Sequence, residues 1–310
     1  MDFEKEIRVA IIQTTMDLSL TWHDDNPFKM NLLEEARIWR EIRDAAAPMT
    51  QLSNSRKPHF ILLPELSLHT KRLGEIRMLA EQTGSIVIGG MDYLVRPDGC
   101  VENRALVTIP RNWPFGKGDS QKKQFYIGKH YAAKDEGQLL KKHNLEFLSH
   151  DKFYILNAGS SGNIGISICA DFYDIERYAI YKGRVQHIFI LAYNQDVKSF
   201  YFLAEAISRL VYCNVVICNT GHYGGSIAFS LYDKEYKRYI YKHEGATLFT
   251  SQIISLPVAP LVTEQLRNPF EHNDHFKSQP PGYVYHYKQQ IVQDISLNED
   301  TSVQRKSLNG

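Results

Sequence analysis

The sequence predicts an α/β protein built from layers of strands and helices. Short apolar runs of strand length alternate along the chain with segments whose apolar residues recur at helical spacing. The strand-like runs are apolar at most positions rather than at every second one, which is typical of sheets covered on both faces. The 310 residues suffice for one large domain or two modest ones, with a substantial core in either case.

The first part of the chain alternates strands and helices. We expect strands in residues 7–13, 59–65, 85–93 and 103–110, and helices in 26–46 and 72–84. Asn26 and Pro27 form a plausible cap and first-turn pair for the first helix. Pro64 is expected to end the second strand, and Gly84 to close the second helix with a left-handed cap.

The later part begins with a long polar segment, residues 112–137, whose length and irregularity indicate a functional loop. After it we expect two strands within 152–169, a helix at 174–183, a strand at 185–194, a helix at 199–213, and strands at 214–220, 224–233 and 244–258. The pattern dissolves near Pro260. We therefore divide the chain into a main domain, 1–260, and a C-terminal extension, 261–310, that ends in a tail of disordered composition.

Composition disfavours several classes of function. A formal net charge of +1 provides no basic surface for nucleic acid. No run of about 18 apolar residues is present, so no membrane span is expected. The four cysteines are widely spread, and the N-terminal segment is charged before it is apolar, unlike a secretory signal. We expect a cytoplasmic protein without disulfides.

No metal or cofactor site is expected. The sequence has no HExxH, no paired CxxC, no phosphate-binding GxxxxGK[ST] and no GxSxG. His272 and His275 could bind a metal, but a surface loop is the simpler interpretation. Cys213 and Cys218 belong to one short strand segment and should point to opposite faces, which favours packing over a joint site.

Three apolar strands end at reactive side chains: "FILLPE" at Glu65, "QFYIGK" at Lys129 and "GISIC" at Cys169. Sites in α/β folds collect at the carboxyl ends of strands, so an acid, a base and a thiol could meet in one pocket. Each residue alone has a plainer interpretation. A buried cysteine is often a small apolar filler. Glu65 could cap a segment or pair with Lys71 or Arg72, and Lys129 could belong to a solvated run of lysines.

Taken together, these segments resemble the nitrilase superfamily, the carbon–nitrogen hydrolases. The order Glu, Lys, Cys matches in "HFILLPELSL", "YIGKHY" and "IGISICADFYD", and similarity extends over roughly residues 7 to 258. The resemblance implies a four-layer α-β-β-α sandwich that forms a homodimer or larger oligomer. It also implies an amidase-like enzyme that cleaves a nonpeptide C–N bond of a small amide, nitrile or carbamoyl substrate, with no cofactor.

The resemblance also implies a role for each residue. Cys169 would attack the substrate and form a thioester, after Glu65 has taken the thiol proton as general base. A base is needed because a free thiol, with a pKa of about 8.5, is mostly protonated at neutral pH. Lys129 and the backbone N–H of Ala170 would stabilise the oxyanion.

Further residues are implied near this set. Family members often carry a second glutamate shortly after the lysine. Glu136 is the candidate, although Asp135 is close enough to be confused with it. His130 fits the residue after the lysine and is a candidate for the substrate pocket, as is Asp171. The following "YAAKDE" lacks the family's proline, which leaves the register of this loop open.

Three more candidates follow the cysteine. Asp171 is expected to support its loop rather than to react. Asn194, at the end of the strand "IFILAYN", is a candidate for the substrate pocket, with a polar turn as the competing interpretation. His222 lies near another strand end and could border the site or a neighbouring subunit.

Two alternatives to hydrolysis remain open at this point. The fold could serve as an oligomerising or ligand-sensing module with little turnover, within a larger system such as phage defence. The thioester could instead be intercepted by an amine, which would make the protein an acyltransferase. This second alternative ranks lower, because the membrane-bound acyltransferases of the superfamily carry transmembrane helices and no such segment is found here.

Overall fold

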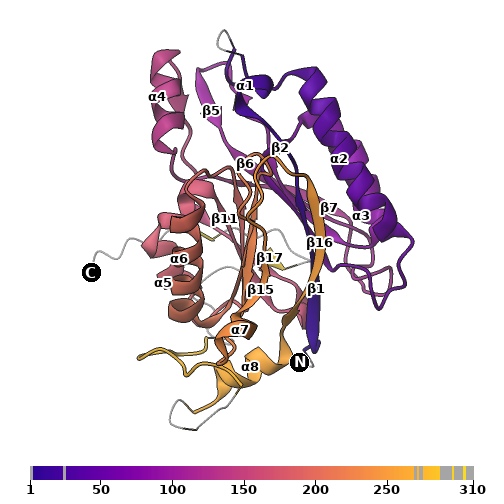
Figure 1. Cartoon of the computed structure of the whole chain (residues 1–310), viewed down its shortest axis with the longest axis vertical. Helices are drawn as coiled ribbons and strands as arrows, with labels where there is room; N and C mark the ends of the chain where they lie inside the picture. The colour runs from indigo at the N-terminus through magenta and orange to yellow at the C-terminus, as the bar shows by residue number, and fades with distance from the viewer. Residues whose placement is uncertain are drawn as a thin grey trace.

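Two β-sheets lie at the centre of the computed structural model, which describes residues 3–23, 26–268, 271, 275–286, 295–296 and 303–304 (Figure 1). The first sheet has the order β16 (Thr250–Pro257), β1 (Glu6–Gln13), β2 (Phe60–Leu68), β3 (Ile86–Met91), β6 (Arg104–Ile109) and β7 (Lys123–Gly128). The second has the order β15 (Tyr239–Lys242), β14 (Ile227–Phe229), β13 (Asn214–Asn219), β12 (His187–Ala192), β11 (Asn163–Ile168), β10 (Ile155–Asn157) and β17 (Ile295–Ser296). The predicted α/β class is confirmed.

Helices cover the outer faces of both sheets (Figure 1). The first sheet carries α2 (Leu32–Thr50) and α3 (Leu73–Thr83), and the second carries α5 (Ile175–Tyr181) and α6 (Val197–Ile207). Alternate residues of β2 explain why its whole length is apolar. Leu62 packs between the sheets, whereas Ile61 and Leu63 pack toward the helices.

The remaining elements are short and lie around this centre. The strands are β4 (Leu94–Val95), β5 (Cys100–Glu102), β8 (Glu146–Phe147), β9 (Lys152–Phe153) and β18 (Val303–Gln304). The α-helices are α1 (Leu18–Thr21), α4 (Lys134–Lys142), α7 (Glu235–Arg238) and α8 (Ala259–Leu266). The 3₁₀ turns are η1 (Thr70–Arg72), η2 (Gly159–Ser161) and η3 (Cys169–Tyr173), and η4 (Ser208–Tyr212) is a π-helical turn.

Strand direction places the site. β1, β2 and β3 pair in parallel, and so do β11, β12 and β13. Within each parallel set the carboxyl ends lie at one edge of the sheet. Residues that follow β2, β11 and β12 can therefore meet even though they lie far apart in the sequence.

Two expected boundaries are wrong. The first long helix begins after Asn31, not after Asn26, because the Asn31 side chain accepts the N–H of Leu33 and caps the helix there. Pro64 does not end its strand, since β2 continues to Leu68. The pairing with β3 shifts register beyond Leu63, so the proline lies where the regular ladder is interrupted.

Two longer expectations also need correction. The segment 112–137 is not one irregular loop, because it contains β7 and the start of α4. The helical pattern does not dissolve at Pro260 either, since this proline occupies the first turn of α8, where a missing N–H costs no hydrogen bond. The predicted boundary at 260 thus falls within a helix, and most of the expected tail, with His272, lies outside the described residues.

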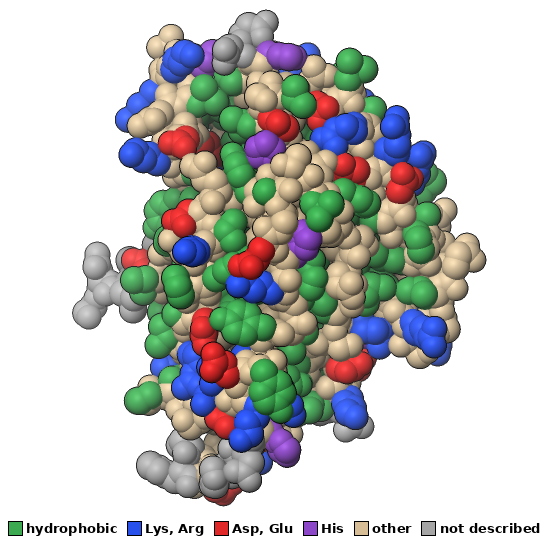
Figure 2. All heavy atoms as spheres, in the orientation of Figure 1, with side chains coloured by type: hydrophobic (Ala, Val, Ile, Leu, Met, Phe, Trp, Pro, Cys, Tyr) green, Lys and Arg blue, Asp and Glu red, His purple; other side chains and the backbone are tan. Residues whose placement is uncertain are grey.

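The expected cap at Gly84 and the opposite faces of Cys213 and Cys218 agree with the structure. Gly84 closes α3 with a φ of 67° in the left-handed region. All four cysteines are free. Cys213 packs toward the helices and Cys218 packs between the sheets. Among the described residues, no helix is both long and apolar enough to cross a bilayer. Figure 2 shows acidic and basic side chains interspersed over the face in view.

Gly90 allows β3 to approach the end of β2 closely. A Cβ at this position would lie 2.3 Å from the Cα of Glu65 and 2.5 Å from the N of Leu66. We expect Gly90→Ala to lower the free energy of unfolding by about 1–3 kcal/mol, because backbone cannot yield as a side-chain tip can. Gly74→Ala in α3 is the control: nothing lies within 4 Å, and alanine favours a helix by about 0.5–1 kcal/mol. Urea unfolding measures both, and an unchanged Gly90→Ala protein would contradict the steric argument.

Candidate functional site

Three charged side chains form a buried cluster, one near the carboxyl end of β2, one just after β7 and one in the first turn of α4. The Nζ of Lys129 lies 2.9 Å from Oε1 of Glu65 and 2.7 Å from Oε2 of Glu136. Lys129 is 1% exposed, so it is not part of a solvated lysine run. Asp135, the rival for the second acid, is exposed on α4. The structure therefore brings Glu136, and not Asp135, to the lysine.

The plainer interpretation of Glu65 also fails. Lys71 and Arg72 pair with Glu35 on α2 instead of with Glu65. The Oε1 atom of Glu65 accepts hydrogen bonds from Lys129, at 2.9 Å, and from a neighbouring asparagine. Its Oε2 atom accepts a hydrogen bond from the backbone just beyond β12 of the second sheet. Glu65 thus belongs to the buried cluster and not to a pair with Lys71 or Arg72.

That asparagine, Asn103, was not indicated by the sequence. Its side-chain NH₂ donates to Oε1 of Glu65 and to Oε1 of Glu136, each at 2.9 Å. Its backbone carbonyl accepts the N–H of Lys129 at 2.8 Å. One residue between β5 and β6 therefore contacts all three charged residues. Its fully buried amide side chain is the signal that identifies it, and burial is not visible in the sequence.

Tyr93 is a second residue that the sequence did not indicate. Its hydroxyl lies near enough to Glu136 for the charge of that carboxylate to act on it. Its ring packs edge-on against Trp22 and Phe28. Burial, together with the charge of Glu136, raises the pKa of Tyr93 well above its usual value. It therefore remains a neutral phenol, able to donate a hydrogen bond to the carboxylate.

Cys169 lies on a sharp turn where β11 ends and η3 begins. Its φ is 44°, in a backbone region that residues other than glycine rarely adopt. The thiol lies 3.8 Å from the carbonyl oxygen of Tyr193. The N–H of Tyr193 donates to Oε2 of Glu65 at 3.1 Å. The residue just beyond β12 thus links the thiol to the carboxylate of the opposite sheet.

Before substrate binds, Cys169 is a protonated thiol and Glu65 is a base, because burial raises both pKa values. Burial raises the pKa of Cys169 well above its usual value; the Glu65 carboxylate adds to the effect and Lys129 opposes it. Burial also raises the pKa of Glu65, despite the attraction of Lys129. A carboxylate with an increased affinity for protons therefore lies beside a protonated thiol.

The charge of Lys129 is secure. Burial alone would lower its pKa, but Glu65 and Glu136 outweigh burial and raise the pKa well above its usual value. For Glu136, Lys129 and Asn103 outweigh burial and lower the pKa. The ammonium and the Glu136 carboxylate therefore stay ionised, and Glu65 is the carboxyl free to exchange a proton.

A second buried ion pair joins the lysine segment to the cysteine turn. Arg177 of α5 lies 2.9 Å from Oδ2 of Asp171. The same carboxylate accepts the backbone N–H groups of His130 and Tyr131 at 2.9–3.1 Å. Asp171 thus fixes the residues after Lys129 against η3, which is a supporting position. Arg177 is the partner that the sequence did not reveal.

The other predicted residues lie at different distances from this centre. The His130 ring bonds the carbonyl of His150. Asn194 lines a cleft above Cys169, but its side-chain amide is bonded to the backbone of Asp196. His222 does not line that cleft.

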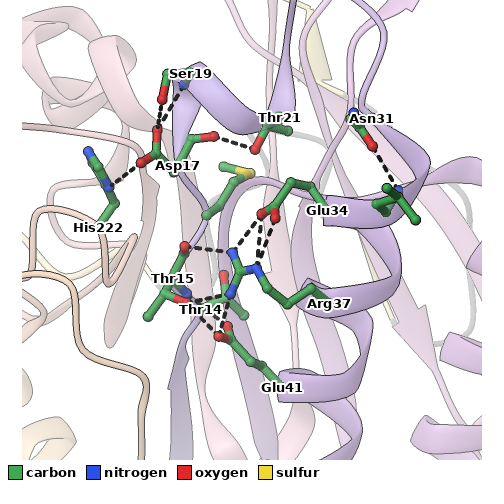
Figure 3. Close-up of polar contacts among 12 residues, drawn as sticks. Thr14, Thr15, Asp17, Ser19, Thr21, Asn31, Glu34, Arg37, Glu41 and His222 are labelled. Atoms are coloured by element: carbon green, nitrogen blue, oxygen red, sulfur yellow. Dashed lines mark hydrogen bonds and ion pairs between the residues drawn. The ribbon is translucent and has the colours of Figure 1, made fainter.

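Figure 3 shows the surroundings of His222, whose Nδ1 lies 3.6 Å from Oδ2 of Asp17. In the same view Arg37 of α2 bonds Glu34, Glu41 and Thr15, which ties this helix to the end of β1. The contacts of Arg37 anchor a helix that covers the first sheet. The contact with Asp17 places His222 at a loop after β1 and not in the cleft that Cys169 lines.

The cleft has a volume of about 550 Å³ and reaches Cys169 and Ala170 at its base. Its walls come from the segment after β7, from the start of α5 and from α6. They are formed by Tyr131, Ala132, Ala133, Lys134, Tyr173, Asp174, Ile175, Glu176, Asn194 and Phe200. Glu65 and Lys129 do not line this cleft. Among the described residues, no group of three or more His, Cys, Asp or Glu side chains is arranged to hold a metal ion.

The Asp171–Arg177 pair gives a stability prediction. Asp171→Ala should lower the free energy of unfolding by about 3–5 kcal/mol, because it leaves a buried guanidinium without its nearest carboxylate. The double variant Asp171→Ala/Arg177→Met should recover part of the loss. Glu244→Ala, which breaks a surface pair with Lys242, is the control and should cost less than about 1 kcal/mol. Equal losses in chemical denaturation would show that burial does not matter here.

The raised thiol pKa gives a reactivity prediction. Thiolate is the reactive form, so a raised pKa leaves little of it at neutral pH, and each pH unit should increase it about tenfold. The rate of Cys169 alkylation by iodoacetamide, followed by peptide mass spectrometry, should still be rising at pH 9. A free peptide thiol, with a pKa of about 8.5, should already be levelling off. A plateau below pH 7 for Cys169 would contradict the assignment.

Comparison with known proteins gives matches in structure alone. No protein-family profile and no curated protein sequence matches the chain. A CN-hydrolase superfamily protein from Xanthomonas campestris, with an arsenic adduct in its active site, matches with a TM-score of 0.58 and 14% identity, over 86% of this chain and 96% of that chain.

Two structures of an amidase from Nesterenkonia sp. AN1 also match. One mutant, with the acetamide moiety of fluoroacetamide covalently added at the active-site cysteine, has a TM-score of 0.55 and 12% identity, over 84% of this chain and 94% of that chain. Another mutant, described as an amidase of the nitrilase superfamily, has a TM-score of 0.57 and 12% identity, over 85% and 95%. At these identities the likeness is one of fold. The chain has the fold of the CN-hydrolase, or nitrilase, superfamily.

Proposed function

We propose that the protein is a carbon–nitrogen hydrolase that cleaves a small amide through a thioester on Cys169. One observation carries the proposal: Glu65 and Lys129 come from distant segments and form an ion pair, and the backbone of Tyr193 links Glu65 to Cys169, which lines a cleft. Structural neighbours that include an amidase with an adduct on its active-site cysteine support it.

The first step forms the thioester bond. Glu65 takes the proton of Cys169, and the sulfur attacks the amide carbon. A C–S bond forms and the carbonyl π electrons move to oxygen. The Lys129 ammonium and the backbone N–H of Ala170 stabilise this oxyanion. Lys129 suits the task because it keeps its charge although its side chain is buried.

The second half returns the enzyme to its starting state. The C–N bond breaks, and the leaving amine takes the proton held by Glu65. A water molecule, deprotonated by Glu65, then attacks the thioester carbon. The C–S bond breaks, and Cys169 regains a proton as the carboxylic acid leaves. Glu65 is suited to this exchange because burial has raised its pKa.

Glu136 and Asn103 hold Lys129 and Glu65 in place. Glu136 neutralises Lys129 when Glu65 is protonated, so the ammonium is never left alone in the interior. Asn103 fixes one oxygen of each carboxylate. Both are proposed as positioning residues.

The arrangement also supports the finer structural expectations. Helices on the outer face of each sheet support the four-layer α-β-β-α sandwich implied by the resemblance. We also propose that the protein assembles into a homodimer or larger oligomer, as the resemblance implies. The complete Glu65–Lys129–Cys169 set favours turnover over the alternative of a ligand-sensing module.

The proposal predicts the behaviour of matched variants. With an amide that the wild type hydrolyses, Cys169→Ala should release no ammonia, and Glu65→Gln should reduce kcat/KM by about 10²- to 10⁴-fold. Glu136→Gln should also reduce it. Asp135→Asn, one residue away and exposed, should leave it unchanged. Circular dichroism checks that each variant is folded.

The same assay separates the alternatives. Full activity in Glu65→Gln would remove the proposed base. If no amide, nitrile or carbamoyl compound releases ammonia, the ligand-sensing alternative is favoured. If added hydroxylamine captures nearly all of the acyl group while water yields almost no acid, the enzyme is an acyltransferase.

A further inference from the structure

The walls of the cleft above Cys169 indicate what the substrate carries beyond its amide. We infer that the enzyme prefers amides with a neutral, apolar acyl group, most simply an aryl or arylalkyl carboxamide. This inference rests on the proposed function and adds a substrate class to it. Size, wall chemistry and charge support it in turn.

The size of the cleft exceeds the needs of a minimal amide. Its volume of about 550 Å³ lies in the range of pockets that enclose drug-sized ligands, about 300–1,000 Å³. An acetamide placed at Cys169 would leave most of this volume unfilled. A larger acyl group would fill it.

Three aromatic side chains contribute apolar surface to the walls. Tyr131 comes from the segment after β7, with its ring against His130 at 4.1 Å. Tyr173 and Phe200 come from η3 and α6, with ring centroids 5.8 Å apart. Tyr131, Tyr173 and Ile175 are 42%, 56% and 80% exposed. A bound apolar group would remove this surface from water, which is the main source of affinity for such a ligand.

The charges near the cleft disfavour an anionic acyl group. Two cations beneath it, Lys129 and Arg177, are buried and already paired with carboxylates. The basic side chain in the wall is Lys134, and two acidic side chains, Asp174 and Glu176, accompany it. Counted together with Glu65, Glu136 and Asp171, which pair with the two buried cations, these groups comprise three cations and five carboxylates. A substrate carboxylate would therefore meet more negative than positive charge.

A set of three amides tests the class directly. We expect kcat/KM to be at least about tenfold higher for 3-phenylpropionamide than for acetamide, because each apolar group placed in a fitting pocket is worth roughly 10- to 200-fold. Succinamate, with a carboxylate in place of the ring, should fall below acetamide. A preference for acetamide or succinamate would overturn the inference and leave the proposed hydrolysis intact.

A matched pair of variants tests the wall. Ile175→Ser, in the first turn of α5, should raise KM for 3-phenylpropionamide about three- to tenfold more than it raises KM for acetamide, because only the larger acyl group would cover this wall. Leu33→Ser is the control, because Leu33 is equally exposed, lies in the first turn of α2 and does not line the cleft. If Ile175→Ser instead leaves the preference unchanged and dissociates an oligomer in light scattering, this surface is a subunit contact and the inference is wrong.

A readout without turnover separates the two proposals. Each amide is tested for protection of Cys169 against iodoacetamide, in wild type and in Glu65→Gln. Protection by 3-phenylpropionamide at a concentration at least about tenfold below that of succinamate supports the substrate class even if no amide is hydrolysed. Equal protection by both compounds contradicts it. Absence of hydrolysis with all three amides counts against the proposed function alone.

Discussion

A single buried ammonium organises this structure. Lys129 is 1% exposed, and an isolated charge at such a position would cost several kilocalories per mole. Glu65 and Glu136 offset that cost, but they belong to β2 and α4 and must be brought there by the fold. Asn103 then separates the two carboxylates and bonds to both. The positions of β2, β6, β7 and α4 are thus coupled through one charge.

The same constraint explains the chemistry proposed for Cys169. Three ionisable groups besides the thiol share a dry site, and their pKa values are pushed apart. Lys129 and Glu136 stabilise each other in the charged form, whereas Glu65 is left as the group that changes its protonation. The second buried pair, Asp171 with Arg177, holds the thiol turn against this cluster. Charge balance and catalytic geometry are therefore two aspects of one arrangement.

Strand-end residues could be predicted from the sequence, whereas contacts made by backbone or by register could not. Glu65 and Cys169 follow apolar runs that a sequence displays directly. Asn103 lies beside Lys129 because β6 pairs with β7. Tyr193 contacts Glu65 through its backbone N–H, which any residue type could supply. The strand β7 was expected from "QFYIGK", yet the segment around it was described as an irregular loop, because the first residues of β7 are polar and half-exposed at the sheet edge. The first helix was begun too early because Asn26 and Asn31 are both plausible caps, and only the side-chain contact distinguishes them.

The proposed mechanism requires a covalent bond between the substrate and Cys169. Wild-type protein mixed with 3-phenylpropionamide, quenched in acid within milliseconds and digested with pepsin, provides the direct measurement. Peptide mass spectrometry should find the phenylpropionyl group, attached as a thioester, on the peptide that contains Cys169, and it should disappear as the amide is consumed. If ammonia is released while no acyl group is detected on that cysteine at any quench time, the thioester mechanism is contradicted.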